Sequence, residues 1–123
     1  MNVPEMVDRN LQLLETESGS YRALLHIDSD FVAFRGHFPD EPILPGITYP
    51  VIAERFACKA LNKTLILTAL KRTKFFQPAF PGVTLHISGK FTDNTENITG
   101  DVIFTDDASN KLSQVKLTLE KYA

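Results

Sequence analysis

The sequence predicts an α+β fold in which an antiparallel sheet wraps around one long, mostly apolar helix. The first observation is that the segment from Pro50 to Leu61 has few polar positions, so a helix formed by it must be buried on most sides. The second is that the chain after this segment consists of short apolar runs separated by turn residues, as in consecutive antiparallel strands. With 123 residues, the chain has the length of one domain, which we place at residues 1–123.

The N-terminal part is expected to begin the sheet. Apolar residues between Val3 and Leu14 fit a short helix that runs into a strand, although periodicity alone does not settle this assignment. The Ser-Gly-Ser sequence at 18–20 is a turn signal. The segments Leu11 to Glu17 and Tyr21 to Ile27 are therefore expected to pair as a hairpin.

The central helix and the strands after it follow from residue spacing. Thr48 or Tyr49 is the expected N-cap, because proline is tolerated in the first turn of a helix. Leu112 does not alternate in register with the apolar residues that follow it, which indicates a bulge near Ser113. A sheet of this kind has exposed edges, and pairing two copies edge to edge would cover them, so we expect a dimer. The expected strands are Thr64 to Lys74, Val83 to Phe91, Ile98 to Phe104 and Leu112 to Leu119.

Composition narrows the class of protein. The chain is 43% hydrophobic and 23% charged, as in globular proteins. It has no apolar run of the roughly 20 residues that span a bilayer, and residues 1–10 have no apolar core typical of a secretory signal. Cys58 is the single cysteine, which excludes an internal disulfide and a multi-cysteine metal site. We expect a cytoplasmic protein without a metal or redox cofactor.

Charges are segregated along the chain. Six basic residues and one acidic residue lie between Glu54 and Lys74, whereas five acidic residues and no basic residue lie between Asp93 and Asp107. The net charge of −2 does not indicate a nucleic-acid partner. A basic belt on an acidic protein fits an acidic macromolecular partner, and the simpler alternative is that these side chains only solvate one face. The six basic residues are Arg55, Lys59, Lys63, Lys71, Arg72 and Lys74.

The stretch from Arg35 to Gly46 is the most unusual part of the sequence. It contains three prolines, two glycines and one histidine. Each proline fixes its own φ and restricts the residue before it, so this backbone is expected to be stiff. A stiff loop holds a side chain in place at little further entropic cost. The side chain of interest is His37, because the imidazole takes up and releases protons near neutral pH.

The string Gly36-His37-Phe38-Pro39, followed by Pro42 and by Pro45-Gly46, resembles a known family signature. The family is that of the hot-dog-fold 3-hydroxyacyl-(acyl carrier protein) dehydratases of the FabA/FabZ type, whose signature reads G-H-F-P-G-x-P-x-x-P-G. Within it, this chain departs only in having Asp40 for a glycine. A second, weaker block from Lys71 to Gly82 is similar to the strand and turn of the subgroup associated with aryl-polyene biosynthesis. The resemblance covers about half of the chain, from roughly Asp30 to Phe91.

The resemblance implies a specific reaction. A 3-hydroxyacyl thioester on the phosphopantetheine arm of acyl carrier protein loses water and becomes a trans-2-enoyl thioester, in fatty-acid or polyene-type biosynthesis. His37 corresponds to the base that removes the C2 proton. The backbone N–H at Gly46 corresponds to the group that polarises the thioester carbonyl, and Gly36, Phe38, Pro39 and Pro45 correspond to the substrate loop. Because carrier proteins are acidic, Lys71, Arg72 and Lys74 become the expected docking residues.

The sequence departs from the family at the expected catalytic acid. The family places this acid on the helix of the other subunit, fourteen residues after the histidine, which here is Val51. Glu54 is the nearest carboxylate, about 60° further round an ideal helix and about 4.5 Å further along it. Tyr49 is a second candidate, although a phenol with a pKa near 10 is a poor acid at neutral pH. An ordinary role for Glu54, such as an ion pair with Lys63 or Arg55, is the alternative.

The other candidate residues have simpler interpretations. His26 and His86 lie on predicted strands without evident partners and are expected at the surface. Cys58 is expected to be a small buried apolar residue of the helix. Four phenylalanines are expected mainly in the core, although some of them could line an acyl tunnel. These are Phe38, Phe75, Phe76 and Phe80.

The leading prediction is thus a dimeric dehydratase. A second hypothesis is a catalytically degenerate subunit that binds acyl cargo, or that partners an active hot-dog paralogue, because Val51 replaces the acid. A third, ranked last, is a hot-dog thioesterase in which Glu54 activates water. The dimer can be homomeric or heteromeric on this reasoning.

Overall fold

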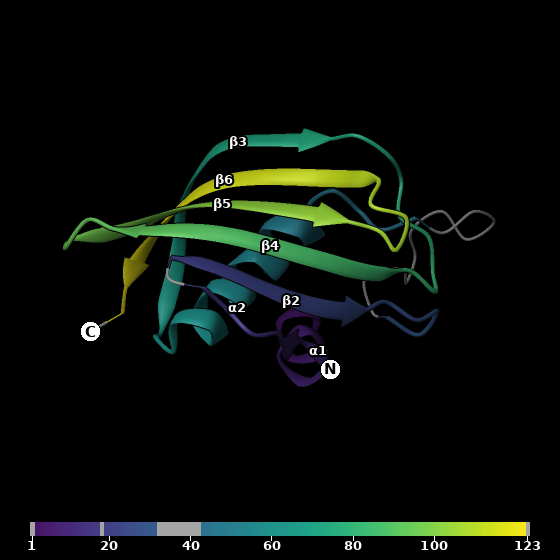
Figure 1. Ribbon diagram of the computed structural model, residues 1–123, viewed down its shortest axis with the longest axis horizontal. Helices are drawn as coiled ribbons and strands as arrows, with labels where there is room; N and C mark the ends of the chain where they lie inside the picture. Colours follow the sequence, from purple (N-terminus) through teal and green to yellow (C-terminus); the bar gives the residue numbers. More distant parts are fainter. Residues whose placement is uncertain (1, 18, 32–42, 123) are drawn as a thin grey trace.

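The computed structural model describes residues 2–17, 19–31 and 43–122. Their strands form one six-stranded antiparallel sheet in the order β1-β2-β4-β5-β6-β3. The predicted α+β class, with a sheet wrapped around one long helix, is confirmed, and Figure 1 shows α2 crossing one face of the sheet. The elements are α1 (Val3–Asn10), β1 (Gln12–Leu13), β2 (Ser20–His26), α2 (Thr48–Leu61), β3 (Leu65–Phe75), β4 (Thr84–Asp93), β5 (Asn97–Thr105) and β6 (Lys111–Lys121).

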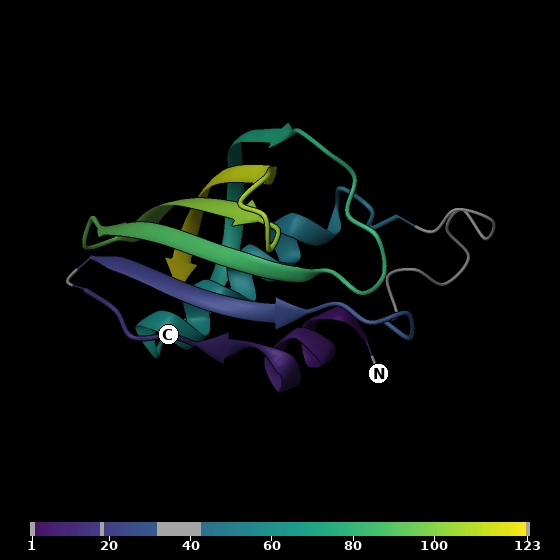
Figure 2. The same cartoon turned by 45° about the vertical axis from the view of Figure 1, so that its right-hand side comes forward.

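The predicted N-terminal helix and hairpin are confirmed, but the first strand is only Gln12–Leu13, shorter than the expected Leu11 to Glu17. Asn2 caps α1, because its side-chain oxygen accepts a hydrogen bond from the backbone N–H of Glu5 at 2.9 Å. The helix ends at Asn10, and β1 follows directly and pairs with β2 as a hairpin. Gly19 lies in the turn with a φ of 78°, a conformation that suits glycine. Figure 2 shows α1 on the same side of the sheet as α2.

The core lies between α2 and the concave face of the sheet. Ile52 and Phe56 of α2 are fully buried, as are Val102 and Phe104 of β5. Gly89 of β4 makes room for this packing, since a Cβ there would lie 2.6 Å from the ring of Phe56. The expectation that α2 is covered on most sides is therefore confirmed.

Two local predictions are refined by the structure. Helix α2 begins at Thr48, and its N-cap is Ile47, which makes no side-chain capping bond; Thr48 and Tyr49 were thus wrongly predicted as caps. The expected bulge near Ser113 is confirmed, because the register of β5 with β6 shifts between Phe104, opposite Ser113, and Thr105. Within the described ranges, no helix is both long and apolar enough to cross a membrane.

Strand β3 forms one edge of the sheet. It pairs with β6 along its length, and its register shifts twice, beside Thr68 and beside Lys71. Exposed apolar side chains gather on and just after this strand, with Leu70 46% and Phe75 59% exposed. An unpaired edge with apolar side chains is a surface that another strand can cover.

Candidate functional site

The site is built at the N-terminal end of α2. The N–H groups of Thr48 and Tyr49 donate to the carbonyls of Pro45 and Gly46 at 3.0 and 3.2 Å, which forms a tight first turn. Among the described residues, the N–H groups of Gly46 and Ile47 have no hydrogen-bond acceptor. The first turn also has no acidic residue. Free N–H groups at the positive end of a helix dipole favour a negatively charged or strongly polarised oxygen.

An apolar pocket of about 430 Å³ lies against this end of the helix. The ring of Tyr49 is held between Phe104 and Phe75, at centroid distances of 5.0 and 6.2 Å. Gly46 allows the close approach of Phe75, because a Cβ at Gly46 would lie 2.7 Å from Cζ of that ring. The pocket is lined by Ile43, Leu44, Gly46, Tyr49, Phe75, Phe76, Gln77 and Pro78.

The phenylalanines of this region were wrongly expected to lie mainly in the core. Phe75, Phe76 and Phe80 are 59%, 46% and 53% exposed. The reason is their place in the fold, since they stand at the end of the edge strand β3 and in the connection to β4. Phe75 and Phe76 instead line the apolar pocket. Only the alternative in which some of these rings line a cavity agrees with this position.

The predicted base lies outside the described residues. This applies to His37 and to the loop residues Gly36, Phe38 and Pro39. The end of the same loop is described, and Leu44 donates its backbone N–H to the carbonyl of Ala79 at 2.8 Å. This bond ties the loop end to the β3–β4 connection, beside the pocket.

Glu54, the candidate acid, has a defined structural contact. Its Oε2 accepts a hydrogen bond from the backbone N–H of Leu67 at 2.9 Å, next to the first register shift of β3. Its Oε1 lies 3.9 Å from Nη1 of Arg55, and its side chain is 24% exposed. The carboxylate therefore braces α2 against the edge strand. Val51, at the position where the family has its acid, is partly buried.

Three basic side chains gather on the convex face of the sheet. Arg72 of β3 lies opposite Lys116 of β6, and Lys74 lies opposite Gln114. Together they line a small pocket of about 40 Å³. Within the described residues, none of the three bases has a carboxylate within 4.0 Å. The nearby Asp101 accepts instead from Nε2 of Gln114, at 2.9 and 3.2 Å.

Only some residues of the predicted basic belt lie together on one surface. Lys71, Arg72 and Lys74 lie on β3, and Lys71 occupies the second register shift. By contrast, Arg55 and Lys59 lie towards the C-terminal end of α2. There Arg55 donates to Asp8, and Lys59 donates to the carbonyl of Leu11. Sequence reasoning missed Lys116, because only strand pairing brings it beside Arg72. The alternation of polar with apolar residues from Gln114 to Glu120 is the sequence signal that could have placed Lys116 on the outer face.

Tyr49 is 3% exposed. Burial raises the pKa of its hydroxyl from 10.0 to about 12. This makes Tyr49 a poor proton donor to a catalytic step at neutral pH, but a permanent hydrogen-bond donor.

The remaining candidate residues have local roles. Nε2 of His86 lies 2.7 Å from Oδ1 of Asp107, and Nδ1 of His26 lies 3.0 Å from Oγ1 of Thr84. Both histidines thus have partners that the sequence did not reveal. Cys58 is half-buried, and its Sγ donates to the carbonyl of Leu65 at 3.4 Å. In the described part of the chain, no three His, Cys, Asp or Glu residues are grouped to hold a metal ion.

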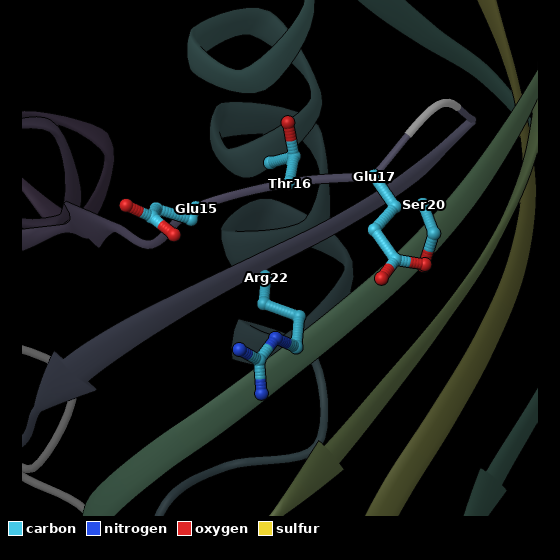
Figure 3. A pocket seen from close by; sticks show the side chains of 5 residues that line it. All are labelled: Glu15, Thr16, Glu17, Ser20 and Arg22. Carbon is cyan, nitrogen blue, oxygen red and sulfur yellow. The ribbon is translucent and has the colours of Figure 1, made fainter.

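A second pocket, of about 390 Å³, lies beside the β1–β2 hairpin and is polar. It is lined by Glu15, Thr16, Glu17, Ser20 and Arg22. Figure 3 shows the carboxylates of Glu15 and Glu17 and the guanidinium of Arg22 pointing in different directions. The side chains do not converge on one point, so this pocket is a weaker candidate site than the one at α2.

Comparison with known proteins gives one family and many relatives. The ApeI-like family, described as ApeI dehydratase, matches residues 14–116. A 3-hydroxyacyl-[acyl-carrier-protein] dehydratase FabZ from Solibacter usitatus is 31% identical over 96 residues, which are 69% of this chain and 56% of the relative. The FabZ of Protochlamydia amoebophila is 33% identical over 94 residues, with 69% and 58% covered. The chain thus spans somewhat more than half the length of these curated relatives.

Solved structures with the same architecture include both dehydratases and coenzyme A binders. The dehydratase heterocomplex ApeI:P from Xenorhabdus doucetiae is similar with a TM-score of 0.74 at 23% identity, over 91% of this chain and 96% of that chain. The protein smu.793 from Streptococcus mutans, bound to acetyl CoA, has a TM-score of 0.73 at 13% identity, with 93% and 90% covered. At these identities the likeness concerns the fold.

Proposed function

Because this chain belongs to the ApeI-like dehydratase family, we propose that it dehydrates 3-hydroxyacyl thioesters carried by acyl carrier protein, in fatty-acid or polyene-type biosynthesis. Its antiparallel sheet around α2 is a hot-dog-like fold. The observation that carries the proposal is the N-terminal end of α2, where the N–H groups of Gly46 and Ile47 have no acceptor among the described residues and Gly46 lines an apolar pocket. This combination suits a thioester, which has one polarisable oxygen and an apolar chain.

In the proposed reaction, the N–H of Gly46 donates to the thioester carbonyl and stabilises the negative charge that develops on its oxygen. His37 removes the proton from C2. The C2–C3 double bond forms as the C–O bond at C3 breaks, and the departing hydroxyl takes up a proton and leaves as water. Pro45 and the other loop residues fix the position of the substrate.

Glu54 is the proposed source of that proton, acting across a dimer interface. Its hydrogen bond to Leu67 does not block this role, since a protonated carboxyl has a second oxygen that can donate. The substitution Glu54→Gln tests the role cleanly, because the amide oxygen still accepts from Leu67. Dehydration is expected to fall by about 10²–10⁴-fold at nearly unchanged stability. A change of less than threefold rejects the assignment.

The proposed enzyme is a dimer. The edge of β3 and the exposed Ile66, Leu70 and Phe75 provide the surface that a second chain would cover. The partner can be an identical chain or a hot-dog paralogue, and the similar structure from Xenorhabdus doucetiae is a heterocomplex.

The proposed docking site for the carrier protein is the basic cluster on β3 and β6. Lys71, Arg72 and Lys74 were expected there, and Lys116 adds a fourth cation. Lys74 directly precedes Phe75 on β3, so the cluster and the apolar pocket lie at the same end of this strand, on opposite faces. A carrier bound at the strand edge would be close to the pocket that receives its acyl arm.

A second candidate function is that of a catalytically degenerate subunit. The specific observation is Val51, a partly buried aliphatic residue where the family has its acid. In this case the chain binds the acyl thioester and the paralogue provides the complete chemistry. New activity of the Val51→Asp variant would favour this alternative.

The test supplies a 3-hydroxyacyl thioester and follows enoyl absorbance and free thiol separately. Enoyl formation supports dehydration, thiol release indicates a thioesterase, and neither signal indicates the degenerate subunit. His37→Ala is expected to abolish dehydration. His86→Ala is the matched control, because it removes a histidine from the convex face, where it contacts Asp107. Equal activity of the His37→Ala variant and the wild-type protein contradicts the proposed base.

A further inference from the structure

Tyr49 is a mostly buried tyrosine, 3% exposed, whose side chain borders the apolar pocket at the end of α2. No hydrogen bond joins its hydroxyl to another described residue. The buried side-chain polar atom that lacks a partner among the described residues is Oγ1 of Thr118, so the Tyr49 hydroxyl is not sealed in the core but is open to the pocket.

The hydroxyl is not needed for packing. The Tyr49 ring contacts Phe104 edge-on at a centroid distance of 5.0 Å and Phe75 at 6.2 Å. These aromatic contacts are equally available to a phenylalanine. The polar group of Tyr49 therefore serves something other than the core, and the neighbouring space is the pocket.

We propose that the Tyr49 hydroxyl donates a hydrogen bond to the oxygen on C3 of the bound acyl group, which makes it a determinant of specificity for 3-hydroxyacyl over unsubstituted acyl thioesters. This inference rests on the proposed function of the same pocket. It assigns Tyr49 to substrate binding and involves no proton transfer.

The choice of the C3 oxygen follows from the order of groups along the pocket. Gly46 is proposed to hold the thioester carbonyl, and Tyr49 belongs to the same helical turn, since its N–H donates to the Gly46 carbonyl at 3.2 Å. In a 3-hydroxyacyl group, the next oxygen is on C3, two carbons from the carbonyl carbon. Gln77 is the other lining residue with a polar side chain, and it is exposed. Among the residues that line the pocket, Tyr49 is thus the mostly buried donor to this oxygen, and a hydroxyl oxygen can accept its hydrogen bond as well as the proton proposed to come from Glu54.

The protonation state of Tyr49 supports a donor role. Burial raises the pKa of its hydroxyl to about 12. The hydroxyl therefore keeps its proton throughout the physiological range, and its hydrogen bond to the substrate is independent of pH there.

The test compares two pantetheine amides by titration calorimetry, a 3-hydroxyhexanoyl amide and the hexanoyl amide. An amide replaces the thioester, so the C2 proton is too weakly acidic to be removed and binding is measured without turnover. Tyr49→Phe is expected to weaken binding of the hydroxylated ligand about tenfold and to leave the hexanoyl ligand within about twofold. Tyr21→Phe is the matched control, because the Tyr21 ring packs on Phe91 and does not line the pocket. Removing this hydroxyl should change the affinity for neither ligand.

The proposal is overturned if Tyr49→Phe weakens both ligands equally, if it weakens neither, or if the wild-type protein does not prefer the hydroxylated ligand. It is also overturned if Gln77→Leu, rather than Tyr49→Phe, removes the preference. The outcome is separable from that of the proposed function. A protein that dehydrates but whose preference survives Tyr49→Phe refutes only the role of Tyr49. A protein that does not dehydrate but loses its preference in Tyr49→Phe refutes only the reaction.

Discussion

Helix α2 is bound by other segments near its C-terminal end, whereas its N-terminal end has no side-chain cap. Arg55 forms two hydrogen bonds with Asp8 of α1, at 2.8 and 2.9 Å. Lys59 donates to the carbonyl of Leu11 at 2.7 Å. Asn62 ends the helix in the left-handed conformation with a φ of 52°, and the N–H of Lys63 returns to the carbonyl of Cys58. At the other end, Ile47 is 72% exposed and makes no capping bond.

The two ends of α2 thus have different roles, one in stability and the other in the proposed function. The C-terminal half uses its polar groups to fix α2 against α1 and β3, which gives the helix a set orientation. At the N-terminal end, the N–H groups of Gly46 and Ile47 have no acceptor in the described part of the chain, and Gly46 and Tyr49 line a pocket. Unused donors at a rigid helix end are already oriented for a ligand, so binding requires little reorganisation. Changes in the two halves should therefore have different consequences.

The largest expected effect is on stability, at a fully buried position of α2. Phe56→Ala should lower the free energy of unfolding by about 3–5 kcal/mol, because Phe56 is fully buried and its ring fills the space left by Gly89. Ile47→Ala is the matched change at the exposed end and should cost less than about 0.5 kcal/mol. Urea unfolding of both variants measures the difference. Similar losses in the two would show that the contrast between the ends is wrong.

A somewhat smaller effect is expected from Tyr49 at high pH. Its pKa is about 12 in the folded protein and 10.0 when exposed, so folding favours the protonated form. This contribution to stability is complete below pH 10 and is lost as the pH rises towards 12, by about 2–3 kcal/mol. The difference in unfolding free energy between the wild-type protein and Tyr49→Phe should change by this amount over that window. A constant difference would mean that the hydroxyl is hydrated in the folded state.

The smallest expected effect concerns the shape of the pocket. Gly46→Ala would place a Cβ 2.7 Å from the ring of Phe75, which is 59% exposed and can move outward. Stability should change by less than about 1 kcal/mol, while kcat/KM for a 3-hydroxyacyl thioester falls about tenfold. A second substitution, Phe75→Leu, removes the clash and should recover part of the loss. If the double variant is no better than Gly46→Ala, the ring of Phe75 is not the cause.

Most of the fold follows from the pattern of apolar residues. The central helix and the strand from Val83 to Phe91 were predicted because burial on one or both faces has a clear period, and the N-terminal hairpin was predicted from its turn signal. The start of α2 was misplaced because proline and threonine suggested a capped helix, whereas the structure has an uncapped end at Ile47. A local signal thus failed at the position where the proposed function needs free donors.

Sequence reasoning could predict the site only where its residues are close together in the sequence. The motif around His37 and Gly46 is contiguous, so its interpretation was open to sequence reasoning. The pocket could not be predicted in this way. Tyr49 and Phe75 are far apart in the sequence, and their rings come together only because β3 runs along the edge of the sheet. The contact of Glu54 with Leu67 and the pairing of Arg72 with Lys116 also depend on strand register, which the sequence leaves undetermined.

The most direct test of the account records backbone amide signals of the isotopically labelled protein by NMR during titration with the hexanoyl amide of pantetheine. The amide signals of Gly46 and Ile47 should shift strongly as the ligand saturates, since these N–H groups, which have no acceptor among the described residues, gain one. The signals of Asn62 and Lys63, at the bonded end of α2, should stay unchanged. Shifts confined to Asn62 and Lys63, or an absence of shifts at Gly46 and Ile47 with bound ligand, would contradict the account.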